Sequence, residues 1–203
     1  MYPKRYRKPD TIILAAGAAS RFGRDKILEP VNGLPMVIHS VMAALKVSER
    51  IIIVTSEKRA PLLHALSLPE KSEVIINQNP QDGMFSSIKC GVSKSNAPAV
   101  FIQPGDCPYV TSRSFLSLLT AFSGEYPAFA ASFEGRKGHP VLLSAKMITM
   151  VLSSSKNQRL DFLLGTGPVC LVETGEPGVL KDVDRPGDIV LEVLCNNENT
   201  FNR

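Results

Sequence analysis

The feature that most constrains the fold of this chain is a short apolar run that leads directly into a small, cationic loop. The run is Thr11-Ile-Ile-Leu-Ala-Ala16, and Gly17 stops it. Its length and β-branched residues predict a buried strand. Small residues in the following loop let backbone N–H groups approach an anion closely, and Arg21 and Lys26 can add full positive charge. The stretch therefore favours a polyphosphate site at the end of a first strand over an ordinary strand–turn–helix with surface cations.

Two common phosphate-binding motifs do not fit this loop. A P-loop has four residues between its first glycine and Gly-Lys-Ser/Thr. Here five residues separate Gly17 from Gly23, and Arg24 follows. The dinucleotide fingerprint Gly-x-Gly-x-x-Gly fails because Ala19 occupies the position of the second glycine. The loop therefore belongs to another class of phosphate-binding turn.

Strand-like apolar runs alternate with helical patterns along the rest of the chain. We expect strands at 11–16, 50–55, 73–76, 97–103, 127–133, 139–144, 169–173 and 179–183. We expect helices at 36–45, 61–68, 83–93, 111–122, 145–153 and 158–164 and from 186 onwards. This alternation predicts a single-domain α/β fold with a doubly wound, mainly parallel sheet and a small antiparallel extension around 127–144. In such sheets, ligands bind outside the carboxyl ends of the strands.

Size and charge suggest how the chain is divided. It has 203 residues, of which 44% are hydrophobic, enough for one sizeable core. We expect residues 1–10 to form a basic, flexible stub, residues 11–195 the folded domain, and residues 196–203 a frayed tail. Basic residues are not interleaved with aromatic ones, which argues against a nucleic-acid surface. The chain has no apolar run of about 18 residues, which argues against a membrane span.

The cysteines indicate a reducing compartment. The four of them are widely spaced, with no Cys-x-x-Cys pair. This spacing argues against a zinc site and against a disulfide framework. Because no secretory signal is evident either, the expected location is the cytoplasm. Cys107 lies beside a candidate metal ligand, and we interpret it as a small filler residue rather than a nucleophile.

Two acidic segments follow apolar runs and are candidates for binding a metal ion. Asp106 comes straight after the run that ends at 102, in a turn that Gly105 and Pro108 constrain. A carboxylate there can bind Mg²⁺ together with phosphate oxygens and waters, or can simply cap the turn. Asp182 and Asp184 point to the same side if their segment is extended. We expect Asp184, which precedes a proline-initiated helix, to be its N-cap.

Two further segments are candidates for binding a ligand. Ser86 and Ser87 lie at the start of a predicted helix, where free N–H groups and hydroxyls can bind a ligand or serve as ordinary caps. His139 lies between Gly138 and a proline. A single histidine beside a proline is more often structural than functional.

The opening loop resembles a known family signature. Leu14-Ala-Ala-Gly-x-x-x-Arg-x-Gly-x-x-Lys26 is similar to that of the nucleotidyltransferases with a Rossmann-like, glycosyltransferase-A-like fold. Four later segments agree in the same order: Gly83-Met-x-x-Ser, Gly105-Asp-x-Pro, Gly138-His-Pro and Asp182-Val-Asp-x-Pro. Within that group the chain resembles the molybdenum cofactor cytidylyltransferase family. Ala16 stands where the guanylyltransferase branch usually has glycine. Arg185 and Gly187 depart from the family's Thr and Glu.

The resemblance implies a reaction and a set of site residues. CMP would pass from CTP to the phosphate of a molybdopterin-type molybdenum cofactor, with release of pyrophosphate and with Mg²⁺ as cofactor. A molybdenum hydroxylase apoenzyme is the implied recipient of the product. The implied nucleotide-binding residues are Leu14, Ala15, Ala16, Gly17, Arg21, Lys26, Gly83, Ser86 and Ser87. Arg21, Lys26 and Asp106 would be catalytic, Asp106 and Asp182 would bind the metal, and Gly138 and His139 would contact the acceptor.

Three alternatives stay open at this point. The acceptor could be another phosphorylated molecule, such as a methylerythritol or choline phosphate. The nucleotide could be GTP. The chain could also be a non-catalytic, nucleotide-binding accessory protein of a molybdenum hydroxylase, although the combination of Arg21, Lys26 and Asp106 argues against that reading.

Overall fold

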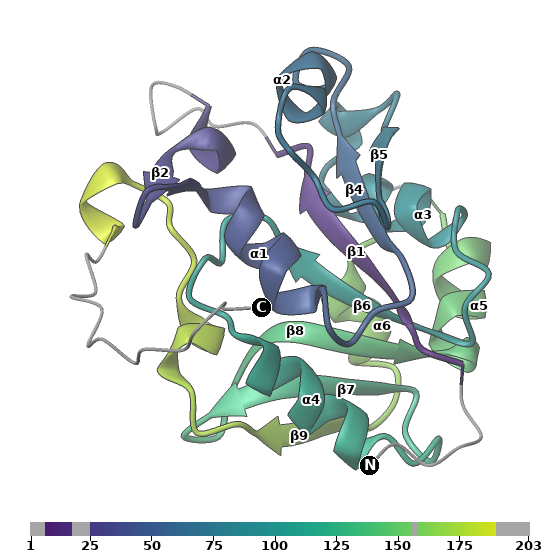
Figure 1. Ribbon diagram of the computed structural model, residues 1–203. Helices are drawn as coiled ribbons and strands as arrows, with labels where there is room; N and C mark the ends of the chain where they lie inside the picture. The colour runs from purple at the N-terminus through teal and green to yellow at the C-terminus, as the bar shows by residue number, and fades with distance from the viewer. Residues whose placement is uncertain (1–6, 18–24, 156–157, 190–203) are drawn as a thin grey trace.

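The computed structural model describes residues 7–17, 25–155 and 158–189. Within these residues, seven strands form one sheet in the order β5-β4-β1-β6-β8-β7-β9 (Figure 1). The strands are β1 (Asp10–Ala15), β4 (Ile51–Thr55), β5 (Ser72–Ile76), β6 (Ala99–Pro104), β7 (Ala128–Phe133), β8 (Arg136–Ser144) and β9 (Val169–Glu173). β5, β4, β1 and β6 are parallel, and β7 is parallel to β9. β8 is antiparallel to both of its neighbours.

Helices cover both faces of the sheet. They are α1 (Met36–Ala44), α2 (Ala60–His64), α3 (Met84–Val92), α4 (Ser112–Ala121), α5 (Ala145–Ser153) and α6 (Leu160–Leu164). Short 3₁₀ turns are η1 (Lys26–Leu28), η2 (Pro80–Asp82), η3 (Pro177–Leu180) and η4 (Pro186–Asp188), and β2 (Pro30–Val31) pairs with β3 (Leu34–Pro35).

Alternation along the buried strands builds one core on each face. Ile13 and its neighbours pack with residues of α1 and α4 on one face, whereas Ile12 packs with residues of α3 and α5 on the other. Both side chains are fully buried, because successive residues of a strand point to opposite faces. The fold class predicted from the sequence is therefore confirmed, including the antiparallel strand within 127–144.

The direction of β8 determines where its first residues lie. Ala99 of β6 pairs with Ser144, and Ile102 pairs with Val141, so the start of β8 lies at the carboxyl end of β6. Gly138 allows the chain to pack closely there. A Cβ on this residue would lie 2.1 Å from the backbone oxygen of Val179. The start of β8 and the turn η3 therefore come together beside the ends of the parallel strands.

Two expectations for the last part of the chain are wrong. The predicted strand at 179–183 is instead the 3₁₀ turn η3 followed by irregular chain. Val179 and Val183 are buried and pair with no strand in the described structure, and the N–H of Val183 donates to the carbonyl of Asp106 at 2.9 Å. The predicted helix from 186 onwards is only the turn η4 as far as the structure describes it. The expectations for residues 1–6 and 196–203 lie outside the described residues.

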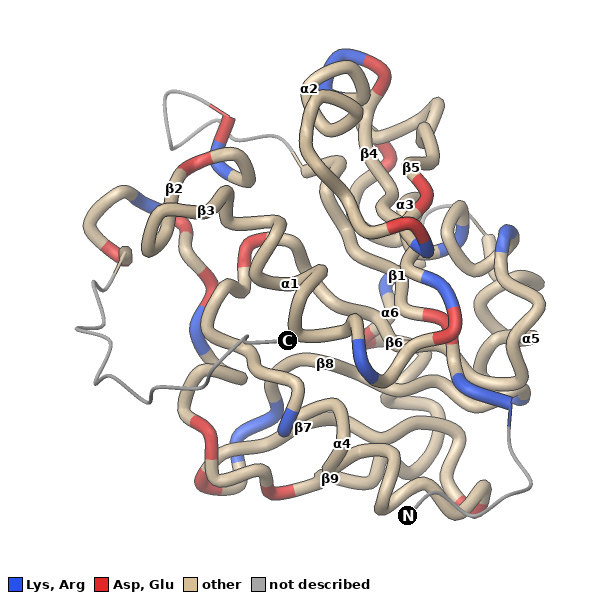
Figure 2. The backbone as a smooth tube through the Cα atoms, viewed as in Figure 1, with Lys and Arg blue, Asp and Glu red and all other residues tan. Residues whose placement is uncertain are grey.

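Charge is spread widely over the described part of the molecule. Lys and Arg occur on many elements and are interspersed with Asp and Glu (Figure 2). In that part of the chain, no helix is long and apolar enough to cross a membrane. The electrostatics of the site therefore depend on local contacts rather than on one broad charged face.

Candidate active site

Two adjoining pockets open at the carboxyl ends of β1 and β6. The loop-side pocket, about 430 Å³, is lined by Leu14, Ala15, Ala16, Gly17, Lys26, Ile27, Arg59, Pro80, Gln81, Gly83, Met84, Ser87, Pro104 and Asp106. The hairpin-side pocket, about 390 Å³, is lined by Leu14, Met84, Ile88, Ile102, Pro104, Asp106, Cys107, Arg136, Lys137, Gly138, His139, Val141, Leu160, Asp161, Leu164, Val179, Leu180 and Asp182. Asp106 lines both pockets, so a group held there can act on ligands in either.

The loop-side pocket brings together most of the residues expected to bind a nucleotide. Leu14 to Gly17, Lys26, Gly83 and Ser87 all line it. Arg21 lies outside the described residues. Ser86 does not line this pocket, and its hydroxyl can donate to the carbonyl oxygen of Asn79 at 2.9 Å or to that of Gly83 at 2.8 Å. The structure thus separates the two serines into one that faces the pocket and one that holds its own turn.

Sequence reasoning missed Asn77, which organises these serines. It follows β5 directly and is buried. Its Nδ2 donates to the hydroxyl of Ser86 at 2.8 Å and to that of Ser87 at 3.0 Å. Its Oδ1 accepts from the N–H of Asn79 at 2.9 Å. Its place at the carboxyl end of a strand is the signal that could have identified it.

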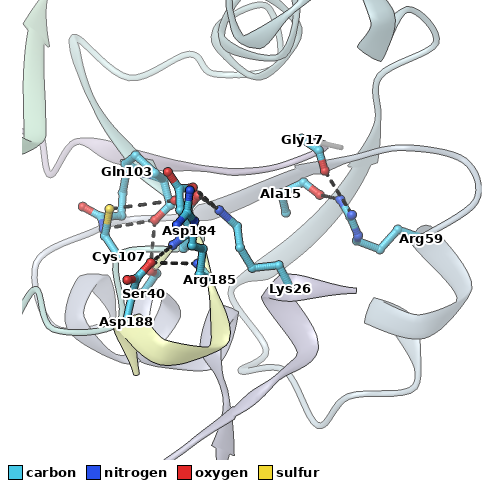
Figure 3. A network of polar contacts seen from close by, with 12 residues as sticks. Ala15, Gly17, Lys26, Ser40, Arg59, Gln103, Cys107, Asp184, Arg185 and Asp188 are labelled. Atoms are coloured by element: carbon cyan, nitrogen blue, oxygen red, sulfur yellow. Dashed lines mark hydrogen bonds and ion pairs between the residues drawn. The ribbon is translucent and has the colours of Figure 1, made fainter. Parts of the chain in front are cut away.

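Lys26 lies between two carboxylates. Its Nζ donates to Oδ2 of Asp106 at 2.7 Å and to Oδ1 of Asp184 at 3.0 Å, and Figure 3 shows the side chain reaching across to this group. Burial lowers the pKa of Lys26, but the hydrogen bonds and charges of Asp106 and Asp184 outweigh burial and raise the pKa above its ordinary value. Lys26 therefore remains a cation at neutral pH.

The expected N-cap role of Asp184 is wrong. Arg185 is the N-cap of η4, and Asp188 closes the turn. Oδ2 of Asp188 accepts from the backbone N–H of Asp184 at 3.0 Å and from that of Arg185 at 2.7 Å. Because Asp188 satisfies these backbone groups, the side chain of Asp184 is available to Lys26.

Asp106 and Asp182 form a donor set that suits Mg²⁺. Both line the hairpin-side pocket, and both raise the pKa of His139, so the two carboxylates lie near the same ring. The described residues contain no cluster of three or more His, Cys, Asp or Glu that could hold a metal. Mg²⁺ does not need such a cage, because it is commonly held by one or two carboxylates with substrate phosphates and waters. The residues present therefore fit a metal that arrives with a phosphate ligand.

The hairpin-side pocket has apolar walls and a polar rim. Its apolar lining comes from β1, β6, β8, α3, α6 and η3. At the rim, Lys137 donates to Asp161 at 2.6 Å. Nδ1 of His139 is buried and has no hydrogen-bond partner among the residues that the structure describes. Burial lowers the pKa of His139 more than Asp106 and Asp182 raise it, so the ring is neutral at pH 7. A neutral ring with an unpaired nitrogen can accept or donate one hydrogen bond to a ligand.

Two residues at this pocket have structural reasons for their identity. Gly138 packs so closely on Val179 that no side chain fits. Cys107 is buried, and burial first and then Asp106 and Asp182 raise the pKa of its thiol well above the ordinary value. A neutral, buried thiol is a poor nucleophile, which agrees with its interpretation as a filler residue.

Arg59 is the second residue that sequence reasoning missed. It precedes α2, a few residues after the end of β4, and its side chain is 8% exposed. It lines the loop-side pocket and contacts the backbone of the opening loop. Its position after a parallel strand is again the signal that could have identified it.

Comparisons with known proteins show what the chain and its fold are similar to. The molybdenum cofactor cytidylyltransferase of Escherichia coli (strain K12) is 27% identical over 183 residues, covering 89% of this chain and 93% of that protein. A probable molybdenum cofactor guanylyltransferase of Thermococcus sibiricus is 30% identical over 107 residues, 50% of each chain. A solved nucleotidyl transferase structure from Methanothermobacter has a TM-score of 0.75 at 19% identity, covering 90% of this chain and 94% of that one.

The family assignment rests on most of the chain. The MobA-like NTP transferase domain matches residues 11–169, from the first strand to the beginning of β9. The matched region contains the opening loop, Asp106 and the start of β8, which are the parts that meet at the two pockets. The chain belongs to the MobA-like NTP transferase domain family and is a nucleotidyltransferase.

Proposed function

We propose that the protein transfers CMP from CTP to the phosphate of a molybdopterin-type molybdenum cofactor and releases pyrophosphate. The observation that carries the proposal is the meeting of two chemically different pockets at Asp106. One offers small residues and cations, which suit a nucleoside triphosphate. The other offers apolar walls with a polar rim, which suit a flat ring system that carries a phosphate.

The loop-side pocket is the proposed nucleotide site. Backbone groups from Ala15 to Gly17 and the ammonium of Lys26 would contact the triphosphate, and Gly83 and Ser87 would lie near the ribose and base. Arg21 is proposed to add a second cation to the phosphates. Ala16 supports CTP over GTP through resemblance alone, because the guanylyltransferase branch usually has glycine at this position.

Lys26 would change its ionic partners when a nucleotide binds. Without substrate, its ammonium neutralises Asp106 and Asp184. A triphosphate competes for the same ammonium, and Asp106 then loses its cation. Asp106 and Asp182 would hold Mg²⁺, which would supply charge neutralisation at the α-phosphate. Lys26 would stabilise the charge that develops on the departing pyrophosphate.

The hairpin-side pocket is the proposed acceptor site. A phosphate monoester is already an anionic nucleophile near neutral pH, so the reaction needs no strong general base. Catalysis then consists of alignment and charge stabilisation. Gly138 and His139 would border the acceptor, with Nδ1 of His139 as a hydrogen-bonding group. The product would pass to the apoenzyme of a molybdenum hydroxylase.

Pyrophosphate release tests the proposal. The protein is incubated with Mg²⁺, molybdenum cofactor and either CTP or GTP, and we expect faster release with CTP. Faster release with GTP would identify a guanylyltransferase. Release with methylerythritol phosphate or choline phosphate in place of the molybdenum cofactor would reassign the acceptor. If the protein binds the nucleotide but releases no pyrophosphate with any acceptor, this would support a non-catalytic accessory protein.

A further inference from the structure

We infer that Arg59 is a positioning residue that fixes both sides of the nucleotide loop, an inference that rests on the proposed function of the loop-side pocket. Arg59 belongs to none of the motifs that identify the family resemblance. It comes from the segment between β4 and α2, about forty residues after the loop. Figure 3 shows its guanidinium directed at Ala15 and Gly17.

Arg59 contacts the residues that precede the opening loop and the residue that follows it. Its Nη1 donates to the carbonyl oxygen of Ala15, and its Nη2 donates to that of Gly17 at 3.1 Å. Its Nε lies 2.8 Å from Oδ1 and 2.7 Å from Oδ2 of Asp25. Ala15 and Gly17 precede the loop, and Asp25 follows it. One planar side chain therefore sets the distance between the end of β1 and the start of η1.

The charge of Arg59 is satisfied within the protein. The guanidinium is paired with Asp25, whose side chain is 27% exposed, and its remaining contacts are to backbone oxygens. A buried cation is costly unless such partners compensate for its desolvation. Because its guanidinium holds Asp25 and two backbone carbonyls at once, Arg59 can act through the positions of those groups.

The ion pair with Asp25 reaches the proposed chemistry through Lys26. Lys26 follows Asp25 in the chain, and its ammonium lies 2.7 Å from Asp106. If Asp25 moves, the start of η1 moves with it, and Lys26 leaves its position at the pocket. A misplacement of about 1 Å can cost roughly 10²-fold in rate even when its cause is distant from the chemistry.

The shape of the guanidinium is central to this role. Arginine presents its donors in a rigid, planar fork, whereas lysine carries a compact point charge on a flexible stem. Lysine at position 59 keeps the charge but cannot contact two carbonyls and a carboxylate with the same geometry. A positioning role therefore predicts that Arg59→Lys is impaired, whereas a purely electrostatic role predicts that it is nearly normal.

The experiment compares Arg59→Met, Arg59→Lys, Asp25→Asn and the double variant Arg59→Met/Asp25→Asn by steady-state kinetics and CTP binding, below their melting temperatures. Arg50→Met is the matched control, because Arg50 pairs with Glu73 at 2.6 Å on the exposed surface, at the other end of β4.

We expect kcat/KM for CTP to fall at least about tenfold in both Arg59 variants, with the KM of the acceptor within about twofold. The double variant should be no worse than Arg59→Met, because the pair acts as one unit.

Several results would overturn the inference. They are unchanged kinetics for CTP, full activity of Arg59→Lys, equal rises in KM for CTP and acceptor, and additive losses in the double variant. If Arg59→Met does not fold, Asp25→Asn provides the same test with a smaller change. If the wild-type protein turns over no acceptor, the proposed function fails, but weaker CTP binding by Arg59→Lys and Asp25→Asn still supports the positioning role. A wild-type protein that does not bind CTP removes the basis of both.

Discussion

The loop-side pocket and the hairpin-side pocket are each assembled from several separate elements, but their polar side chains are supported differently. In the first, Lys26 and Arg59 are already paired with carboxylates. In the second, Nδ1 of His139 is buried without a partner among the described residues. The difference teaches that the proposed nucleotide half is held by ion pairs of largely buried cations, while the start of the proposed acceptor half is held by close backbone packing at Gly138. Substitutions can separate these two kinds of support.

The largest expected effect belongs to Asp106, which both pockets share. Asp106→Asn removes the charge that pairs with Lys26 and would hold the metal, so we expect kcat to fall by about 10²–10³. Pyrophosphate release at saturating CTP and acceptor measures the effect. Glu73→Gln, which alters an exposed ion pair with Arg50, is the control and should be normal. Near-normal turnover of Asp106→Asn would remove this residue from the mechanism.

Gly138→Ala tests the packing of the acceptor half. The added Cβ would meet backbone atoms of Val179, which cannot rotate away, so we expect a loss of about 1–3 kcal/mol in the free energy of unfolding. The KM of the acceptor should rise while the KM of CTP stays constant. Chemical denaturation and steady-state kinetics measure the two effects. Gly167→Ala, where the nearest atom lies 3.6 Å away, is the control. A stable Gly138→Ala variant would contradict the packing argument.

Gly17→Ala is the matching test of the nucleotide half. No described atom lies within 4 Å of an added Cβ, so stability should change by less than about 0.5 kcal/mol. The methyl group would instead hinder the approach of the phosphates, and we expect KM for CTP to rise about tenfold, or about 1.4 kcal/mol. Gly187→Ala, equally open among the described residues but outside both pockets, is the control. If Gly17→Ala unfolds the protein, the contrast between the two halves is wrong.

The smallest effect concerns the pH dependence of stability. Burial lowers the pKa of His139 below its ordinary value of 6.5, so the unfolded chain binds a proton that the folded protein does not. Stability from this residue is present above pH 6.5 and is lost as the pH falls below it. The melting temperature of His139→Gln should therefore fall less than that of the wild type between about pH 8 and pH 5. His64→Gln, on an exposed residue, is the control. Parallel pH profiles for wild type and His139→Gln would contradict this assignment.

The first strand and the position of Asp106 at the loop-side pocket were predictable from the sequence because their signals are local. The run from Thr11 to Ala16 predicts a strand that the structure places at Asp10–Ala15. Asp106 follows β6, as expected for a residue at the carboxyl edge. Buried strands and the small residues that follow them are visible in a few consecutive letters. No contact across the fold is needed to recognise them.

The remaining features depend on contacts between distant residues. The apolar residues around Val179 predict a strand, but they pack beside β7 and β8 without pairing with any strand in the described structure. From the sequence, Asp184 is expected to be a helix cap. In the structure, Asp188 accepts the backbone hydrogen bond of this turn, and the carboxylate of Asp184 pairs with Lys26, 158 residues away. Arg59 looks like an ordinary surface cation in the sequence. Its burial depends on Asp25 and on two carbonyls of another segment.

The reversed direction of β8 has a consequence for redesigning the enzyme. Because β8 is antiparallel to β6, the hairpin between β7 and β8 lies at the carboxyl ends of the parallel strands. It is one continuous segment, residues 133–141. That piece borders only the hairpin-side pocket. A grafted hairpin from a relative could therefore exchange the acceptor while the triphosphate loop keeps its geometry. If the two pockets bind as proposed, the residues that select the acceptor and those that select the nucleotide lie on separate elements of one sheet.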